Sequence, residues 1–190
     1  MADNRVLGAT KHGLLCLFDG LWPRLALLVG FLLAAPAVAS DLPVPSGRVL
    51  LTVTGAITNT NAQAAGSAAA QFDRAMLEAL DWRDVLTFTA WTEGERTFSG
   101  PTLASLIAAV GAESATLRAT AINDYSVDIP AGDARTYDVL LAMELDGKKL
   151  RIRDKGPIWV VYPQEASEAG KNKAHGEKMI WQLRDIAFVD

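Results

Sequence analysis

The sequence predicts an α+β fold that is mostly β, with mixed sheets and few helices. Short runs of β-branched and aromatic residues are separated by Gly, Pro and Asn/Asp turns, which is typical of strands. Only two segments show clear helical periodicity, and helices do not alternate regularly with strands as they do in a parallel α/β sheet. The chain has 190 residues, of which 50% are hydrophobic, and this length allows one domain with a substantial core.

The first 39 residues have the pattern of a secretory signal peptide. Arg24 precedes an uncharged, mostly apolar run over residues 25–35, and small residues follow up to Ala39. The run is too short to span a bilayer; an uncleaved N-terminal anchor is the alternative. We therefore expect cleavage near Ala39 and a single periplasmic or secreted domain over residues 40–190. The leader has no Arg-Arg pair, which favours export as an unfolded chain over the twin-arginine route.

Composition excludes several classes of function. The net charge of -4 argues against a nucleic-acid partner, which attracts strongly basic proteins. The single cysteine, Cys16, and one of the two histidines, His12, lie in the predicted leader. His175 is then the one remaining histidine, which excludes a zinc site built on several His or Cys ligands of one chain. We find no phosphate-binding or nucleophile-elbow motif, so no catalytic or metal-ligating residue is assigned.

The first half of the predicted domain begins with a strand over residues 48–55, where β-branched residues end at a glycine. A small, polar loop follows over residues 56–66. Phe72, Met76 and Leu80 recur every four residues, which predicts an amphipathic helix over 68–80 with Ser67 as its N-cap. Alternation and aromatic residues predict a strand over 84–92.

A second helix is predicted to open at Ser99-Gly100-Pro101, with Pro101 at its first position and Gly111 closing it. Two strands, 116–122 and 125–129, are then joined by the turn Asn123-Asp124. Residues 131–138 form a polar connection.

The last third contains a short apolar element over 139–145 and a hairpin turn at Asp146-Gly147 that leads into 149–153. The continuous apolar run 158–162 predicts a strand buried on both faces. Residues 164–178 form a long segment with almost no apolar anchor, which is typical of a binding loop. A closing strand is predicted over 181–189.

Six stretches resemble, in order, one known family. They are LTVTG at 51–55, FSGPTLASLI at 98–107, NDYSVDIP at 123–130, LLAMELDGKKL at 140–150, KGPIWVVYP at 155–163 and GEKMIWQLRDI at 176–186. Together they cover roughly residues 48–189 and resemble the molybdopterin-binding oxidoreductase domain, the catalytic domain type of sulfite oxidase. The resemblance implies a sulfite-oxidase-type fold, mostly β, that holds molybdopterin in a cleft.

The sequence departs from this family where the metal is held. The resemblance implies a cysteine thiolate, a soft ligand for molybdenum, near the end of residues 87–92, where the chain has no cysteine. The hydroxyls of Thr89 and Thr92 are poor substitutes because they stay protonated near neutral pH. Trp159 stands where much of the family has arginine, and Trp181 stands where it has a second lysine, whereas Lys178 keeps the first.

The resemblance and the polarity of the loops together define a candidate ligand cleft. Its members are Trp91, Thr92, Asn123, Asp124, Tyr125, Lys171, Lys173, His175 and Lys178. Trp91 ends its strand before an acidic turn and is the favoured pocket wall, while residues 123–125 match the family's Asp-Gly-Tyr region. His175 and the three lysines are predicted to bind an anion. The alternative for residues 123–125 is an ordinary turn without a ligand. The alternative for His175 and the lysines is a solvated basic loop.

The functional hypothesis is an exported protein that keeps this fold without molybdenum redox chemistry. It would act as a small-ligand-binding, accessory or sensor module, with a small anionic or aromatic ligand and a membrane-bound signalling or redox partner. The resemblance implies that the cofactor is inserted in the cytoplasm before folded export, so a chain exported unfolded would lack it. Two alternatives stay open: a molybdopterin-dependent oxidoreductase with a non-cysteine metal site, and a protein-interaction module without a ligand.

Overall fold

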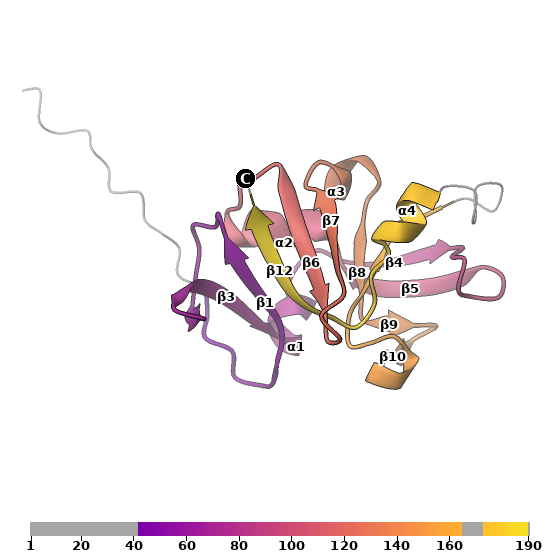
Figure 1. Ribbon diagram of the computed structural model, residues 1–190. Coiled ribbons are helices and arrows are strands. Elements are labelled where there is room, and N and C mark those ends of the chain that lie inside the picture. Colours follow the sequence, from indigo (N-terminus) through magenta and orange to yellow (C-terminus); the bar gives the residue numbers. More distant parts are fainter. Residues whose placement is uncertain (1–41, 165–172, 190) are drawn as a thin grey trace, which may run out of the picture. The chain divides into compact units, whose positions relative to one another are not determined.

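The computed structural model describes residues 42–164 and 173–189, without the side chains of Lys173 and Ala174. Within these residues the chain forms twelve strands and four short α-helices, arranged as mixed sheets. The predicted fold class, α+β and mostly β, is therefore confirmed (Figure 1). The predicted signal peptide lies outside the described residues.

The largest sheet has six strands and mixes parallel and antiparallel pairing. Its strands, in spatial order, are β2 (Ala62–Ala64), β3 (Ser67–Asp73), β1 (Val49–Gly55), β12 (Leu183–Val189), β6 (Thr116–Ala121) and β7 (Ser126–Pro130). The central pair β1 and β12 is parallel, and every other pair is antiparallel. The first and last strands of the described domain thus lie side by side at the centre of this sheet (Figure 1).

Two smaller sheets complete the β structure. One has the order β10 (Lys148–Lys149), β9 (Glu144–Leu145), β5 (Arg96–Pro101), β4 (Trp82–Thr87), and the other pairs β11 (Trp159–Val161) with β8 (Leu140–Ala142). A 3₁₀ turn, η1 (Ile152–Asp154), follows β10. All three residues of β11 are buried, as the apolar run predicts.

The four helices are α1 (Arg74–Glu78), α2 (Leu103–Val110), α3 (Asp133–Thr136) and α4 (Lys173–Lys178). In α2 the Thr102 hydroxyl caps the helix by accepting a hydrogen bond from Ser105 N at 3.2 Å. Gly111 ends it in the left-handed region with φ 61°, a conformation that glycine adopts without steric cost. In Figure 1 this helix lies behind the large sheet.

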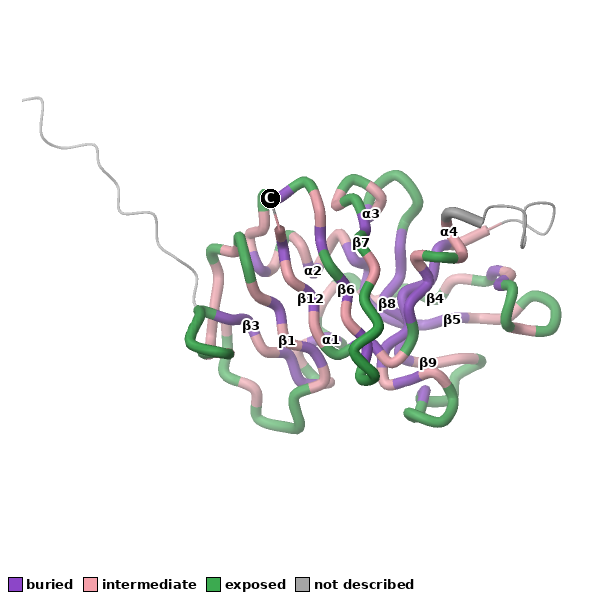
Figure 2. Tube along the Cα trace, viewed as in Figure 1, coloured by how far each residue is buried: buried purple, intermediate pink, exposed green. Residues whose placement is uncertain are grey.

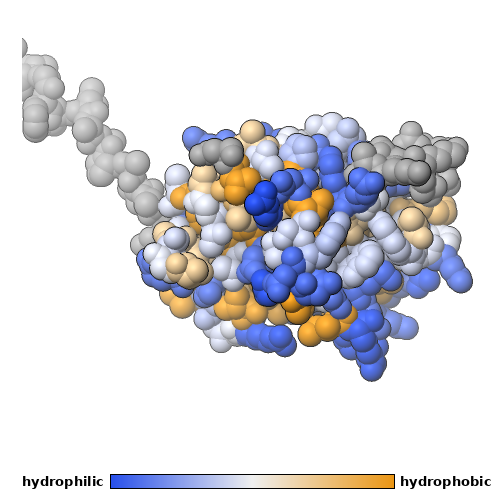
Figure 3. All heavy atoms as spheres, viewed as in Figure 1, coloured by the Kyte–Doolittle hydropathy of each residue, from blue (hydrophilic) through white to orange (hydrophobic). Residues whose placement is uncertain are grey.

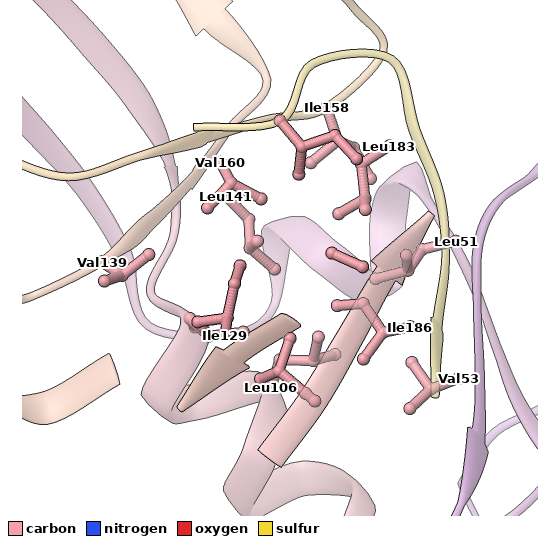
Figure 4. Packing of buried hydrophobic residues seen from close by; sticks show 14 of the residues in the cluster. Leu51, Val53, Leu106, Ile129, Val139, Leu141, Ile158, Val160, Leu183 and Ile186 are labelled. Carbon is pink, nitrogen blue, oxygen red and sulfur yellow. The ribbon is translucent and has the colours of Figure 1, made fainter. Parts of the chain in front are cut away.

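The main hydrophobic core lies between the large sheet and α2. Leu51 and Val53 of β1 and Ile186 of β12 are fully buried and belong to one cluster with Leu106 of α2. Figure 4 shows these side chains converging from the strands and the helix. Figure 2 shows buried positions along the strand centres, with exposure concentrated in the connections. Along β1, buried and partly exposed residues alternate, as expected for a strand that covers a core on one face.

The prediction of a helix over 68–80 was wrong in its first half. Ser67–Asp73 is strand β3, which pairs with β1 on one side and with β2 on the other. The helix begins only at Arg74, because the Asp73 carboxylate accepts a hydrogen bond from Met76 N at 3.0 Å and caps it there. The predicted loop 56–66 correspondingly contains β2, the hairpin partner of β3.

Smaller corrections concern element boundaries. The strand predicted over 84–92 ends at Thr87, and Pro101 is the last residue of β5 and not the first of α2. The connection 131–138 contains α3, and 149–153 leaves the sheet after Lys149 to enter η1. At Pro101 the cause is clear, because Pro101 pairs with Trp82 of β4 and Thr102 caps α2, and neither contact is visible in local periodicity.

In residues 42–164 and 173–189, no helix has the length and apolar character needed to cross a bilayer.

Candidate functional site

A pocket of about 550 Å³ opens where four connections meet. These connections are the turn after β4, the turn between β6 and β7, the segment after β11, and the passage from α4 into β12. The pocket is lined by Ala90, Trp91, Ala121, Asn123, Tyr125, Gln164, Gly176, Glu177, Met179, Ile180 and Trp181. Its lining therefore includes residues from the end of 87–92 and from two stretches on which the family resemblance rests, 123–130 and 176–186.

Three tryptophans form one cluster behind and along the pocket wall. Trp91 and Trp181 meet edge to face with ring centroids 5.5 Å apart, and both pack against Trp159 at 6.2 and 6.3 Å. Trp159 is 1% exposed, whereas Trp91 is 38% and Trp181 36% exposed. Trp159 is thus a core support, and the other two present ring surface to the pocket and the solvent.

Trp159 is fixed by contacts on several sides. Its indole Nε1–H donates a hydrogen bond to the Met179 carbonyl at 3.3 Å, and its ring meets Phe98 edge to face at 5.3 Å. The Lys155 ammonium lies 5.3 Å from the ring centroid of Trp159 and 5.8 Å from that of Trp181, close enough for cation–π attraction. The cluster therefore already holds one cation.

Threonine hydroxyls shape the turn that carries Trp91. Thr89 Oγ1 and Thr92 Oγ1 are 2.9 Å apart and share a hydrogen bond, and Thr89 Oγ1 also accepts one from Trp91 N at 3.3 Å. These are the two hydroxyls nearest the position at which the resemblance places a cysteine. They are engaged within the turn, and Thr92 does not line the pocket.

The three residues of the turn between β6 and β7, 123–125, have different surroundings. Asp124 adopts a left-handed conformation with φ 64°, and its carboxylate turns to Arg184, with an Oδ1 to Nη2 distance of 3.2 Å. Asn123 Oδ1 accepts a hydrogen bond from Tyr125 N at 3.3 Å. Asn123 and Tyr125 consequently line the pocket, and Asp124 does not.

Helix α4 lies close to β7, and its residues His175 and Lys178 contact Tyr162, after β11, and Asp133 of α3. The Lys178 ammonium lies 2.7 Å from Asp133 Oδ2, and the His175 ring stacks on Tyr162 with centroids 4.9 Å apart. His175 and Lys178 are three residues apart and share one helix face. Gly176 and Glu177, which lie between them in the sequence, line the pocket. Two of the four predicted anion-binding side chains, His175 and Lys178, thus hold the helix in place and do not line the pocket.

Tyr162 shares the carboxylate of Asp133 with Lys178. Its hydroxyl donates a hydrogen bond to Asp133 Oδ2 at 2.9 Å. Burial, reinforced by that carboxylate, raises the pKa of the Tyr162 phenol far above its ordinary value, so the group stays protonated and remains a donor.

The remaining predicted site residues cannot be placed in the pocket. Lys171 lies outside the described residues, and Lys173 begins α4 with its side chain outside what is described. Among the described lining residues, Glu177 is the one acidic side chain, and lysine and arginine do not occur. Exposed lysines and arginines instead gather on β10 and η1, where Figure 3 shows a hydrophilic region at the lower right.

Sequence reasoning missed Gln164, Glu177 and Met179 as lining residues. Gln164 begins the segment 164–178 that the sequence predicts as a binding loop, and its buried Oε1 has no hydrogen-bond partner among the described residues. The loop prediction covers Gln164, but nothing in the sequence singles out its side chain. Glu177 and Met179 flank Lys178 in a stretch that resembles the family, so the motif pointed to the right segment and the wrong side chain.

The comparisons with known proteins agree with the fold and with the resemblance. The family described as oxidoreductase molybdopterin binding domain matches residues 58–170, which is more than half of the chain, and the chain belongs to this family. The crystal structure of the sulfane dehydrogenase SoxCD from Paracoccus pantotrophus is similar, with a TM-score of 0.55 and 16% sequence identity. The match covers 79% of this chain and 40% of the SoxCD chain. No curated protein matches the chain.

The family's cofactor can be tested against the residues present. Molybdopterin carries a negatively charged phosphate, and it brings a metal that takes thiolate ligands. The described lining offers one thioether, one carboxylate and no lysine or arginine. No group of three His, Cys, Asp or Glu side chains that could hold a metal occurs in the described ranges. The described lining does not fit a thiolate-held molybdenum centre.

Proposed function

We propose that this chain is an exported, small-ligand-binding module that keeps the molybdopterin-binding oxidoreductase fold without molybdenum redox chemistry. The observation that carries the proposal is the pocket beside the turn after β4. Where the resemblance implies a metal-ligating cysteine, the chain has Thr89 to Thr92, and Trp91 and Trp181 form a wall. Exposed aromatic rings beside a pocket are suited to binding an organic ligand.

The composition of the pocket supports binding over catalysis. Its walls are aromatic and aliphatic, and a few polar side chains, Asn123, Gln164 and Glu177, converge on it. This is the usual make-up of a site that recognises a small molecule. The wall is supported from behind by Trp159, which is buried, so the site is largely formed before a ligand arrives.

The first experiment concerns the cofactor. The protein is purified from its native compartment in cells that make molybdopterin, and its molybdenum content and pterin fluorescence after denaturation are measured. We expect molybdenum far below one atom per chain and no released pterin. Stoichiometric molybdenum would overturn the proposal and favour an oxidoreductase with a non-cysteine metal site.

The second experiment concerns the ligand. The melting temperature is measured with anions, pterins and aromatic metabolites, because a ligand at 100 times its Kd stabilises the folded state by about 2.7 kcal/mol. We expect a rise with one class that the Trp91→Ala variant loses. No rise with any class would instead favour a protein-interaction module.

Export and the partner are further parts of the proposal. An apolar run with a small-residue end supports cleavage near Ala39, and the intact mass of the exported protein tests it. We propose a membrane-bound signalling or redox protein as partner, which cross-linking in intact cells followed by mass spectrometry would identify.

A further inference from the structure

We infer that the pocket takes a small organic ammonium ion, a protonated amine that carries an apolar or aromatic group. This inference rests on the proposed function, since it names the ligand class of the same pocket. Two independent features of the described lining attract a positive charge: the aromatic rings of its wall and a carboxylate.

The aromatic wall is suited to an ammonium ion. The rings of Trp91 and Trp181 are inclined at 74°, so their faces point in two directions, as a cage around a cation requires. Tyr125 adds a third ring that is 55% exposed. The indole faces of this cluster already attract one ammonium, that of Lys155, at 5.3 Å from the Trp159 centroid.

The side chain of Gln164 is a polar part of the wall and is not counted among the features that select the ligand. Gln164 lines the pocket, but its Oε1 is buried, with no hydrogen-bond partner among the described residues, and is therefore turned away from the open part of the pocket. The Gln164 backbone is held in place because Thr87 Oγ1 accepts from Gln164 N at 2.7 Å and donates to Gln164 O at 3.0 Å.

The charges of the site disfavour an anion. Glu177 lines the pocket and is exposed, so it would repel a carboxylate or a phosphate. Lys178, the cation nearest to it in sequence, is paired with Asp133 at 2.7 Å. Among the lining residues that the structure describes, neither lysine nor arginine occurs. A neutral aromatic molecule would use the walls and leave the Glu177 carboxylate without a charged partner.

The effect of replacing Lys155 on ligand affinity has opposite directions for a cationic and an anionic ligand. The Lys155 ammonium lies 5.8 Å from the Trp181 centroid without lining the pocket, and it would repel a second cation on the same ring. Lys155→Gln removes this repulsion and should strengthen amine binding. For an anionic ligand the same substitution would weaken binding.

The experiment uses three probes that share one ring: 2-phenylethylamine, 2-phenylethanol and phenylacetate. Their affinities for the full chain are measured by titration calorimetry at neutral pH. We expect the amine to bind about tenfold more tightly than the alcohol, the gain typical of a cation on aromatic and charge-assisted contacts. Phenylacetate should bind most weakly. Glu177→Gln should weaken the amine several-fold and leave the alcohol nearly unchanged.

Matched variants control for net charge. Lys149→Gln changes an exposed lysine of β10, and Glu113→Gln changes an exposed carboxylate that does not line the pocket. Neither should alter the affinity for the amine, while Lys155→Gln should raise it.

The outcomes separate the inference from the proposed function. If phenylacetate binds as tightly as the amine, or if Lys155→Gln weakens the amine, the ligand class is wrong. Binding of all three probes with equal affinity, lost in Trp91→Ala, would also reject the ammonium class and leave the pocket as a binding site. Binding of none would reject the class as well, and the molybdenum content then decides the proposed function separately.

Discussion

The side chain of Thr87 and the backbone of Gln164 bond to each other in both directions. Thr87 Oγ1 accepts a hydrogen bond from Gln164 N at 2.7 Å and donates one to Gln164 O at 3.0 Å. Thr87 is the last residue of β4 and is fully buried. This pair therefore ties the end of β4 to the segment that follows β11, where Gln164 lines the pocket.

Thr87→Val should destabilise the protein by about 1–3 kcal/mol, because it leaves both backbone groups of Gln164 without this partner. The free energy of unfolding in urea, followed by tryptophan fluorescence, measures the loss. Thr87→Ser keeps the hydroxyl and is the control, and it should retain most of the stability. A larger loss in Thr87→Ser than in Thr87→Val would show that the methyl group, and not the hydroxyl, stabilises this junction.

Trp159 and Trp91 belong to one cluster but should differ in their contribution to stability. Trp159→Ala removes a side chain that is 1% exposed and leaves a cavity, at a cost of about 3–5 kcal/mol. Trp91→Ala removes a ring that is 38% exposed and should cost about 1 kcal/mol, near the value of one aromatic pair. Chemical denaturation of both variants measures the difference.

Comparable losses in Trp91→Ala and Trp159→Ala would mean that Trp91 is a core residue, and its role as a pocket wall would fail. The comparison also protects the ligand experiments, because a Trp91→Ala variant that stays folded can report the loss of binding alone.

Local patterns predicted the elements that carry their own signals. The β-branched run of β1, the left-handed Gly111 after α2 and the buried run of β11 were all predicted from sequence, because each depends on neighbouring residues. The segment 67–73 was not, since its alanines are compatible with a helix and only pairing with β1 and β2 makes it a strand. Long-range pairing overrides local periodicity here.

The candidate site was predicted by segment more reliably than by side chain. Trp91, Asn123 and Tyr125 line the pocket, whereas Thr92 is engaged within its turn and Asp124 pairs with Arg184. Which side of a turn or of a short helix faces a pocket depends on the backbone conformation, such as the φ of 64° at Asp124. That information lies in the three-dimensional contacts and not in the motif.

The pH dependence of stability should include a contribution from Asp73. Hydrogen bonds from the backbone N–H groups of Met76 and Gly47 hold the pKa of the Asp73 carboxyl below its ordinary value. A carboxyl with a lower pKa in the folded state stabilises the protein above its unfolded pKa, about 3.9. That contribution is lost as the pH falls through the folded pKa.

Asp73→Asn should therefore lower stability at pH 7 and flatten its decline at acid pH. Urea unfolding of both proteins between pH 7 and pH 2 measures the two curves, which we expect to approach each other below about pH 4. Parallel curves over the whole range would show that the Asp73 charge contributes nothing to folding.

Two glycines offer a matched pair for testing how closely β5 approaches β8. A Cβ at Gly100 would run into the backbone carbonyl of Leu141, whereas a Cβ at Gly132 would meet nothing within 4 Å. Because the Leu141 backbone belongs to a buried strand and has little freedom to move, Gly100→Ala should destabilise the protein by about 3 kcal/mol. Gly132 has φ −61°, which alanine adopts freely, so Gly132→Ala should change stability by less than about 1 kcal/mol. Urea midpoints of the two variants measure the contrast, and similar midpoints would mean that the two strands can separate enough to admit a methyl group.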